Sequence, residues 1–285
     1  MNIKQLIKKL IPSFILDLRI KISNNMRLKK FYGLQKSELD TRNLIPLNNI
    51  NLNNILNDEK ILNSWKNWQV KLETLGVADF QGGVNPGDQK AIFFLIRYLK
   101  PKSVLEIGTH IGASTVNIAS AINYNQDETN SKSILRTVDI NDVNCSSKKY
   151  WIKYGMKRSP GNMIEALNLP LSVDFITNNS IDYFNKTDDN YDFIFLDGDH
   201  SAVTVYQEIP KALSKLNKNG IILLHDYFPN GKPLWPNKNP IKGPYLATER
   251  FIKEKADIII LPLGSLPWKT KLGSNKTSLA LFLKK

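Results

Sequence analysis

The 285-residue sequence has a single cysteine, three histidines and no uninterrupted apolar run that approaches the ~18 residues of a membrane-spanning helix. The single cysteine, Cys145, excludes an internal disulfide and suits a reducing compartment. Acidic residues are scarce, with 26 Asp and Glu against 39 Lys and Arg, so the formal charge is +13. Because 42 % of the residues are hydrophobic, the chain can still bury a core. We expect a folded, cytoplasmic protein without a spanning helix.

The positive charge is concentrated at the start of the chain. Residues 1–35 contain eight Lys and Arg against one acid, Asp17, and apolar residues recur between them near helical spacing. One interpretation is a basic amphipathic helix within residues 1–30 that lies on the inner face of an anionic membrane or docks a partner. The other is an ordinary N-terminal helix with a solvated face. Charges interrupt the segment too often for the apolar core of a signal peptide.

Nucleic acid is another partner that a basic chain suggests. No recognisable nucleic-acid-binding module and no regular aromatic interleaving accompany the charge, so we expect no specific nucleic-acid binding. A homo-oligomer is compatible with this composition.

We divide the chain into a basic segment with an Asn-rich linker at 1–56 and one domain at 57–285. Residues 57–100 are expected to be helical, with Asn85 as a helix N-cap and Pro86 at the first helical position. Residues 101–285 alternate strand and helix, which predicts an α/β domain whose mostly parallel sheet has helices on both faces. Strands are expected at 103–108, 134–140, 172–177, 191–197, 220–226, 256–263 and 278–285. The last two lack a long helix between them, which indicates antiparallel pairing, and Pro210 is expected to shorten or kink its helix.

A glycine turn follows the first expected strand, and an acid ends the second. The turn runs from Gly108 to Gly112, where glycine allows close approach of the backbone to a ligand and the next helix offers free N–H groups. Asp139 lies thirty-one residues past Gly108 (139 − 108), where a carboxylate can accept from both ribose hydroxyls. The alternative is that Asp139 caps a helix over 142–151, although Asp142 is better placed for that.

All three histidines lie at or just after expected strand ends. His110 follows the first strand, His200 follows the fourth in the run Asp197-Gly198-Asp199-His200, and His225 precedes Asp226 at the end of the fifth. In a doubly wound sheet these three strands are neighbours, and their carboxyl ends face one crevice where such sheets bind ligands. We therefore expect the histidines to converge with the three acids in one site.

The motifs "VLEIGTHIGAST", "TVDI", "FIFLDGDHS" and "GIILLHDY", in this order and spacing, resemble those of class I S-adenosylmethionine-dependent methyltransferases. They are most similar to the small-molecule O-methyltransferases that include the catechol and macrolide-sugar enzymes. The resemblance covers about residues 84–285. It implies a Rossmann-like, doubly wound, seven-stranded sheet whose last strand is antiparallel, and methyl transfer to a hydroxyl.

By position, the resemblance assigns a cofactor-binding role to one set of residues. Four of them would lie at the methionine end, Asp139 at the ribose and two at the adenine. His110 departs from the family pattern, because many methyltransferases have glycine in the middle of this turn. The full set of expected cofactor-binding residues is Glu106, Gly108, His110, Gly112, Ser114, Asp139, Asn179, Ser180 and Asp197.

In metal-dependent relatives, acids at the ends of the fourth and fifth strands hold a divalent cation. The matching residues are Asp197, His225 and Asp226. Carboxylate ligands favour Mg²⁺, with Mn²⁺ as an alternative. His225 departs from an all-oxygen set, so it either shifts the preference toward Mn²⁺, Fe²⁺ or Zn²⁺ or is not a ligand. Asp199 matches the general base of the sugar-modifying relatives, and His200 is the rival base because its ordinary pKa is closer to neutral.

The Pro-, Gly- and Lys-rich segment 227–245 is expected to be a lid over the acceptor or a plain surface insertion. In the first interpretation Trp235 and Tyr245 stack on a sugar or aromatic ring, while Lys232, Lys238 and Lys242 attract an anionic acceptor. We expect a small-molecule or sugar acceptor, for example a glycan precursor. The alternatives are a metal-independent methyltransferase of the same fold, a D-x-D phosphatase and a binding protein without activity.

Overall fold

The computed structural model describes residues 13–74, 83–236 and 240–285. The chain forms two compact units, residues 1–37 and residues 38–285. No described helix is long and apolar enough to cross a membrane. The second unit contains the sheet and every predicted site residue.

The centre of the second unit is a seven-stranded sheet in the order β3-β2-β1-β4-β5-β7-β6. The first five strands in sequence are parallel, whereas β7 pairs antiparallel with both β5 and β6. This confirms the predicted fold class, the adjacency of the first, fourth and fifth strands and the antiparallel pairing at the C-terminal side. The strands are β1 (Ser103–Ile107), β2 (Ile134–Asp139), β3 (Ser172–Thr177), β4 (Tyr191–Leu196), β5 (Leu216–Leu224), β6 (Ile258–Pro262) and β7 (Ala280–Lys284).

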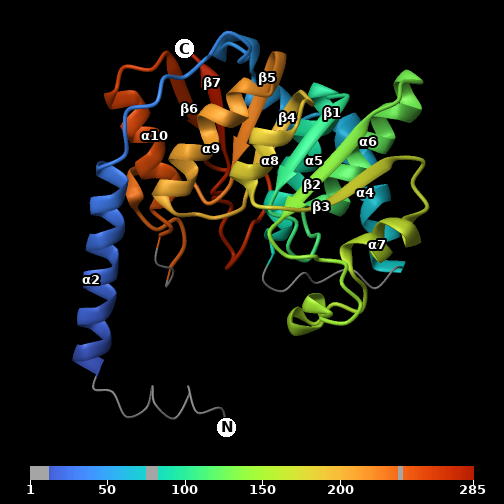
Figure 1. The fold of residues 1–285 in the computed structure, drawn as a ribbon. Helices are drawn as coiled ribbons and strands as arrows, with labels where there is room; N and C mark the ends of the chain where they lie inside the picture. Colours follow the sequence, from blue (N-terminus) through green and yellow to red (C-terminus); the bar gives the residue numbers. More distant parts are fainter. Residues whose placement is uncertain (1–12, 75–82, 237–239) are drawn as a thin grey trace. The chain divides into compact units, whose positions relative to one another are not determined.

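Helices cover both faces of the sheet (Figure 1). One contacting group contains α3 (Leu52–Leu56), α4 (Glu59–Thr74), α5 (Pro86–Leu99), α6 (Thr115–Thr129) and α7 (Pro160–Leu167). The other contains α8 (Ser180–Lys186), α9 (Ala202–Ser214) and α10 (Gly243–Lys253). Asn85 caps α5 as predicted, since its side chain accepts from the N–H of Asp88, and Pro86 opens the helix. Pro210 lies inside α9, which ends four residues later at Ser214.

Three short 3-10 helices complete the described elements of the second unit: η1 (Leu47–Asn49), η2 (Tyr150–Tyr154) and η3 (Pro229–Gly231). Residues 142–149 form turns, so the α-helix that Asp139 or Asp142 would cap is not present there. The Asp142 carboxylate instead accepts from the N–H of Asn144 at 3.1 Å. Asn and Ser residues in this stretch favour such local side-chain bonds over a helix.

The segment 38–56 packs into the second unit, where the sequence suggested a loose linker. Leu44, Ile55 and Leu56 are buried. The N–H of Ile45 donates to the carbonyl of Gly220 at 3.0 Å, and its carbonyl accepts from Lys284 at the same distance. The difference arises because these partners lie more than 150 residues away in sequence (220 − 45 and 284 − 45), and local composition does not reveal them.

The first unit contains α2 (Ser13–Tyr32), a helix of 20 residues. This agrees with the helical spacing predicted for the basic segment, of which residues 1–12 lie outside the described part. Lys29 and Lys30 lie in the last turn, and Ile22 and Met26 are exposed on the helix. Membrane or partner contact through this helix stays a prediction.

Candidate active site

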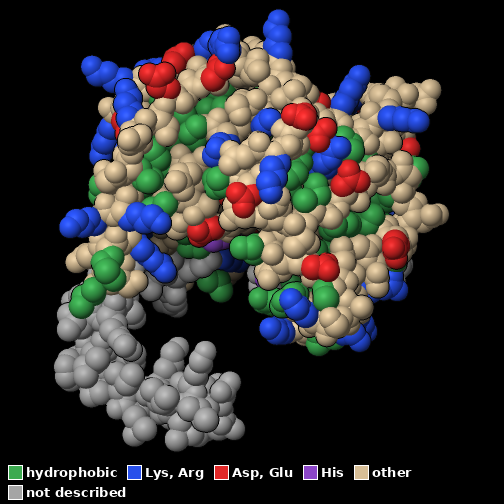
Figure 2. Space-filling view, in the orientation of Figure 1, with side chains coloured by type: hydrophobic (Ala, Val, Ile, Leu, Met, Phe, Trp, Pro, Cys, Tyr) green, Lys and Arg blue, Asp and Glu red, His purple; other side chains and the backbone are tan. Residues whose placement is uncertain are grey.

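A cavity of about 940 Å³ opens at the carboxyl ends of β1, β2, β4 and β5. Six ionisable residues predicted to converge all line it: His110, Asp197, Asp199, His200, His225 and Asp226. On the face shown in Figure 2, Lys and Arg side chains lie scattered among Asp and Glu side chains. Part of a His side chain is visible beside an acidic side chain in the lower half of this face. The convergence follows from the strand order, because parallel strands present their carboxyl ends at one edge.

The turn after β1 brings backbone close to the strand that carries Asp197. Gly108 has φ +100, and a Cβ at this position would lie 2.2 Å from the carbonyl oxygen of Asp197. His110 has φ 49 and lines the cavity, with its ring 4.4 Å from that of Tyr154. Burial lowers the pKa of His110 below its ordinary value, against the charges of Asp139 and Asp197. Position 108 therefore requires glycine, because a side chain there would collide with the backbone of Asp197. His110 adopts the left-handed backbone conformation as a non-glycine residue.

Glu106 and Gly112 are not among the described residues that line the cavity. The buried Glu106 carboxylate accepts from the hydroxyls of Ser114 at 2.5 Å, Thr115 at 2.5 Å and Thr137 at 2.6 Å. Ser114 itself lines the cavity. Glu106 thus holds the start of α6 against β2, and its expected role in cofactor binding stays a prediction.

Two buried glutamates give the stability a specific pH dependence. Burial raises the pKa of Glu106 to about 7 despite its three hydroxyl donors, and burial likewise raises the pKa of Glu208 to about 7 against its bond from Ser180. Unfolded glutamate titrates near ~4.3, so the folded state holds more protons between the two values. The free energy of unfolding should therefore fall as the pH rises from about 4.5 to about 7, by up to roughly 3 kcal/mol per group.

Urea unfolding at pH 5 and pH 7.5 measures this dependence. We expect Glu106→Gln to remove part of the decline and Glu106→Gln with Glu208→Gln to remove most of it. Glu165→Gln changes an exposed acid on α7 and is the matched control. A decline that persists unchanged in the double variant would show that other groups cause it.

Residues at the ends of β2 and β3 form the adjoining wall. One carboxylate oxygen of Asp139 accepts from the N–H of His110 at 2.9 Å, and the other accepts from the N–H of Asn141 at 2.8 Å. Asn179 caps α8 by accepting from the N–H of Ile181 at 2.9 Å, and Ser180 donates to Glu208 at 2.5 Å. Asp139, Asn179 and Ser180 all line the cavity, as the proposed ribose and adenine roles require.

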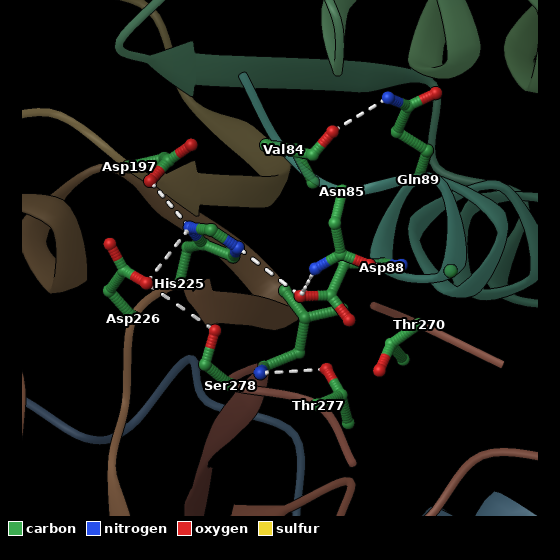
Figure 3. Close-up of polar contacts among 12 residues, drawn as sticks. Val84, Asn85, Asp88, Gln89, Asp197, His225, Asp226, Thr270, Thr277 and Ser278 are labelled. Atoms are coloured by element: carbon green, nitrogen blue, oxygen red, sulfur yellow. Dashed lines mark hydrogen bonds and ion pairs between the residues drawn. The ribbon is translucent and has the colours of Figure 1, made fainter. Parts of the chain in front are cut away.

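Asp197, His225 and Asp226 offer three ligand atoms that lie within 4.8 Å of one another. His225 Nδ1 lies 2.8 Å from Asp197 Oδ1 and 3.9 Å from Asp226 Oδ1 (Figure 3). Burial lowers the pKa of His225, but the charges of Asp197 and Asp226 and the bonds to Asp197 and Asp88 outweigh it and raise the pKa well above its ordinary value. The cluster therefore attracts positive charge, either a proton on the ring or a cation.

Asp88 is a member of this cluster that the sequence did not indicate. Its carboxylate is fully buried at the start of α5, and its Oδ2 lies 3.3 Å from His225 Nε2. It also accepts from the side-chain amide of Asn85 at 2.7 Å. An acid in the first turn of a helix is common for electrostatic reasons alone, so the local sequence gave no separate signal.

The two candidate bases are placed differently. Burial raises the pKa of Asp199, but hydrogen bonds from Thr204 and Ser201 outweigh it and lower the pKa below its ordinary value. The carboxylate thus stabilises the start of α9, where Ser201 is the N-cap. His200 Nε2 lies 3.6 Å from Asp226 Oδ2, and the side chain is 35 % exposed. Because hydrogen bonds occupy the Asp199 carboxylate, His200 is the more open of the two side chains to a ligand in the cavity.

The segment after β5 contributes one aromatic wall. Trp235 is buried, lines the cavity and contacts Phe228 edge-on with ring centroids 5.8 Å apart. Lys271 also lines the cavity, with its Nζ 4.2 Å from the Trp235 ring centroid. Tyr245, Lys232 and Lys242 are not among the described lining residues, and Lys238 lies outside the described residues. Gly243 opens α10, and a Cβ there would lie 1.8 Å from the carbonyl oxygen of His200.

The fold is a doubly wound α/β domain in which a glycine turn after β1 and an acid at the end of β2 face a cluster of acids and histidines. Domains of this kind commonly bind nucleoside cofactors at this edge of the sheet. A family model described as a methyltransferase domain matches residues 105–227. This match and the strand order both agree with the class I S-adenosylmethionine-dependent methyltransferases that the motifs resemble.

One curated relative is a probable caffeoyl-CoA O-methyltransferase 1 from Dictyostelium discoideum, 26 % identical over 163 residues. The match covers 56 % of this chain and 62 % of that protein, so the chain spans less than two thirds of its length. Among solved structures, an O-methyltransferase from Bacillus cereus in complex with SAH is 17 % identical, with 80 % of this chain and 91 % of that chain covered and a TM-score of 0.48. SAH-bound PaMTH1 from Podospora anserina is 20 % identical, with 70 % and 78 % covered and a TM-score of 0.44.

Proposed function

We propose that the protein transfers a methyl group from S-adenosylmethionine to a hydroxyl of a small molecule, assisted by a divalent cation. The observation that supports this most directly is the cluster of Asp197, His225 and Asp226 in the same cavity as the Gly108 turn and Asp139. Cofactor binding by the turn and the β2 acid leaves the β4 and β5 ends for the acceptor. The name of the Dictyostelium relative supports transfer to oxygen.

The donor set is suited to a cation. Ligand atoms around an octahedral ion at ~2.1 Å lie about 3 Å apart when adjacent and about 4.2 Å apart when opposite. The distances of 2.8 and 3.9 Å from His225 Nδ1 to the two carboxylates are of this size. Three carboxylates also converge on one imidazole, since Asp88 joins Asp197 and Asp226. A bound cation would balance this charge.

In the proposed mechanism, Asp197, His225 and Asp226 would hold the cation, which when bound lowers the pKa of the acceptor hydroxyl. Asp139 and the turn around Gly108 orient the cofactor so that methyl donor and acceptor oxygen are aligned. His200 takes the acceptor proton on Nε2, because the hydrogen bonds to Asp199 already occupy that carboxylate. Trp235 closes one side of the cavity and limits access of water.

The proposed acceptor is a small molecule with neighbouring hydroxyls. Trp235 offers an aromatic face to a ring, and Lys271 beside it offers a positive charge to an acidic group. A phenolic thioester of the kind named for the Dictyostelium relative and a sugar or glycan precursor both have these features. The acidic wall of Asp197, Asp199 and Asp226 makes a purely anionic acceptor without a cation unfavourable.

Calorimetry with S-adenosylmethionine and an SAH-release assay test the proposal. We expect binding of the cofactor and methyl transfer to caffeoyl-CoA or to one of a panel of phenolic and sugar diols. Thorough chelation with EDTA should abolish turnover, and Mg²⁺ or Mn²⁺ should restore it. Absence of cofactor binding would refute the methyltransferase activity, while full activity after chelation would favour the metal-independent alternative, in which His225 stays paired with Asp197.

A further inference from the structure

His225 lies between two carboxylates that approach opposite sides of its ring. Nδ1 faces Asp197 Oδ1 at 2.8 Å, and Nε2 faces Asp88 Oδ2 at 3.3 Å (Figure 3). The two acids come from different elements, β4 and the first turn of α5. The ring is 10 % exposed, so this arrangement is enclosed by protein.

Apart from His225, the Asp88 carboxylate has one side-chain partner among the described residues, the Asn85 amide that donates to Oδ2 at 2.7 Å. Asp88 is 0 % exposed, and its Oδ1 is buried without a hydrogen-bond partner among the described residues. A buried carboxylate with an unsatisfied oxygen is unfavourable unless positive charge lies close by. The N-cap role at α5 belongs to Asn85, whose side chain accepts from the N–H of Asp88. A neutral Asn or Ser at position 88 would therefore serve the helix without this penalty.

We propose that Asp88 is a positioning residue that accepts a hydrogen bond from Nε2–H of His225 and thereby directs Nδ1 to the cation. This rests on the metal-assisted function proposed above. Ligating histidines commonly donate their second N–H to a carboxylate, which fixes the tautomer and the ring orientation. Here the Nδ1 side is also the side of both other ligands, with Asp197 Oδ1 at 2.8 Å and Asp226 Oδ1 at 3.9 Å.

The consequence is a metal preference. A set of two carboxylates is an oxygen site that suits Mg²⁺, whereas an imidazole nitrogen held in the ligand position favours first-row transition metals. Asp88 therefore adjusts selectivity through His225 without touching the metal. The site prefers Mn²⁺ and its heavier neighbours over Mg²⁺.

Titration of the full-length protein with Mn²⁺ and with Mg²⁺, in the presence of S-adenosylmethionine, tests the role of Asp88. In Asp88→Asn we expect the Mn²⁺ affinity to fall about 10- to 100-fold. The Mg²⁺ affinity should change less, so the ratio of the two affinities falls. If Asp88 acted only through its negative charge, the affinities for Mn²⁺ and Mg²⁺ would instead fall by the same factor. His225→Asn should lower the same ratio, and Asp58→Asn, which removes an acid from the start of α4, should leave it unchanged.

Two spectroscopic measurements on the unmodified protein keep the test independent of variant folding. Pulsed EPR of the Mn²⁺ form should show ¹⁴N coupling from a directly bound imidazole. Long-range ¹⁵N NMR of the Zn²⁺ form, with only three histidines to assign, should show Nδ1 bound and Nε2 protonated. Absent ¹⁴N coupling, Nε2 coordination or an unchanged affinity ratio in Asp88→Asn would each overturn the inference and leave a metal-assisted function standing. Failure of the protein to bind any of the three metals would overturn both.

Discussion

Replacement of Asp197 by alanine is expected to abolish methyl transfer while S-adenosylmethionine still binds. Asp197 follows β4 and its Oδ1 lies 2.8 Å from His225 Nδ1. It is the ligand that the β4 end contributes to the proposed cation site, whereas His225 and Asp226 come from the β5 end. Its loss also leaves His225 without its nearest partner on the Nδ1 side. Stabilisation of the acceptor oxygen by a metal is worth several kcal/mol, so we expect turnover to fall about 10³-fold.

SAH release measures the loss of turnover, and calorimetry measures whether the cofactor still binds. Asp142→Ala is the matched control, because it deletes the same side chain from an exposed turn that does not line the cavity. It should retain wild-type turnover. If Asp197→Ala lost cofactor affinity by the same factor as turnover, Asp197 would be a cofactor ligand and the cation role would be wrong.

Gly108→Ala is expected to destabilise the protein at the turn after β1, where the proposed cofactor site lies. The residue has φ +100, and the added Cβ would meet the Asp197 carbonyl oxygen at 2.2 Å, its carbon at 2.7 Å and the N–H nitrogen of Gly198 at 3.0 Å. These are backbone atoms of a neighbouring strand end, so rotation of a side chain cannot relieve the contact. Backbone strain and forced separation of β1 from β4 together should lower the free energy of unfolding by about 3 kcal/mol.

Urea unfolding compares this variant with Gly264→Ala. Gly264 also has positive φ, +72, but a Cβ there would meet nothing within 4 Å. The control therefore reports backbone strain alone, about 1 kcal/mol, and the difference between the two variants reports the contact with β4. Equal destabilisation of the two variants would mean that the contact is relieved by a small shift. We also expect Gly108→Ala to weaken cofactor binding at least tenfold in calorimetry.

The sequence predicts the sheet well because each strand carries its own signal. The apolar runs before Asp139, Asp197 and Asp226 become β2, β4 and β5, and each acid then lies at the cavity edge. Parallel order and right-handed connections leave few arrangements, so convergence of the three histidines follows from strand position alone. The local apolar pattern and the strand topology are therefore sufficient to predict the sheet and the residues at its carboxyl edge.

What the sequence did not reveal depends on contacts between distant segments. Asp88 reaches His225 across 137 residues, and a first-turn acid looks the same whether it faces solvent or a buried ring. Gly243 approaches His200 through the packing of α10 on the start of α9, which no local pattern encodes. The bonds that the buried Glu106 carboxylate accepts from Ser114, Thr115 and Thr137 were likewise not evident from the sequence, because they join β1 to α6 and β2.

The position of β7 beside β5 determines when the open edge of β5 is covered during synthesis. β7 pairs with β5 sixty residues after it, through Ile222 and Phe282 (282 − 222), and Ser278 holds the β5 end through the N–H of Tyr227 at 2.8 Å. A ribosome-bound chain that has already made His225 and Asp226 still exposes one edge of β5, which can pair wrongly with another nascent chain. The edge of β5 beside His225 and Asp226 is therefore covered only when residues 280–284 have joined the sheet, and a chain that lacks them exposes an edge that favours aggregation.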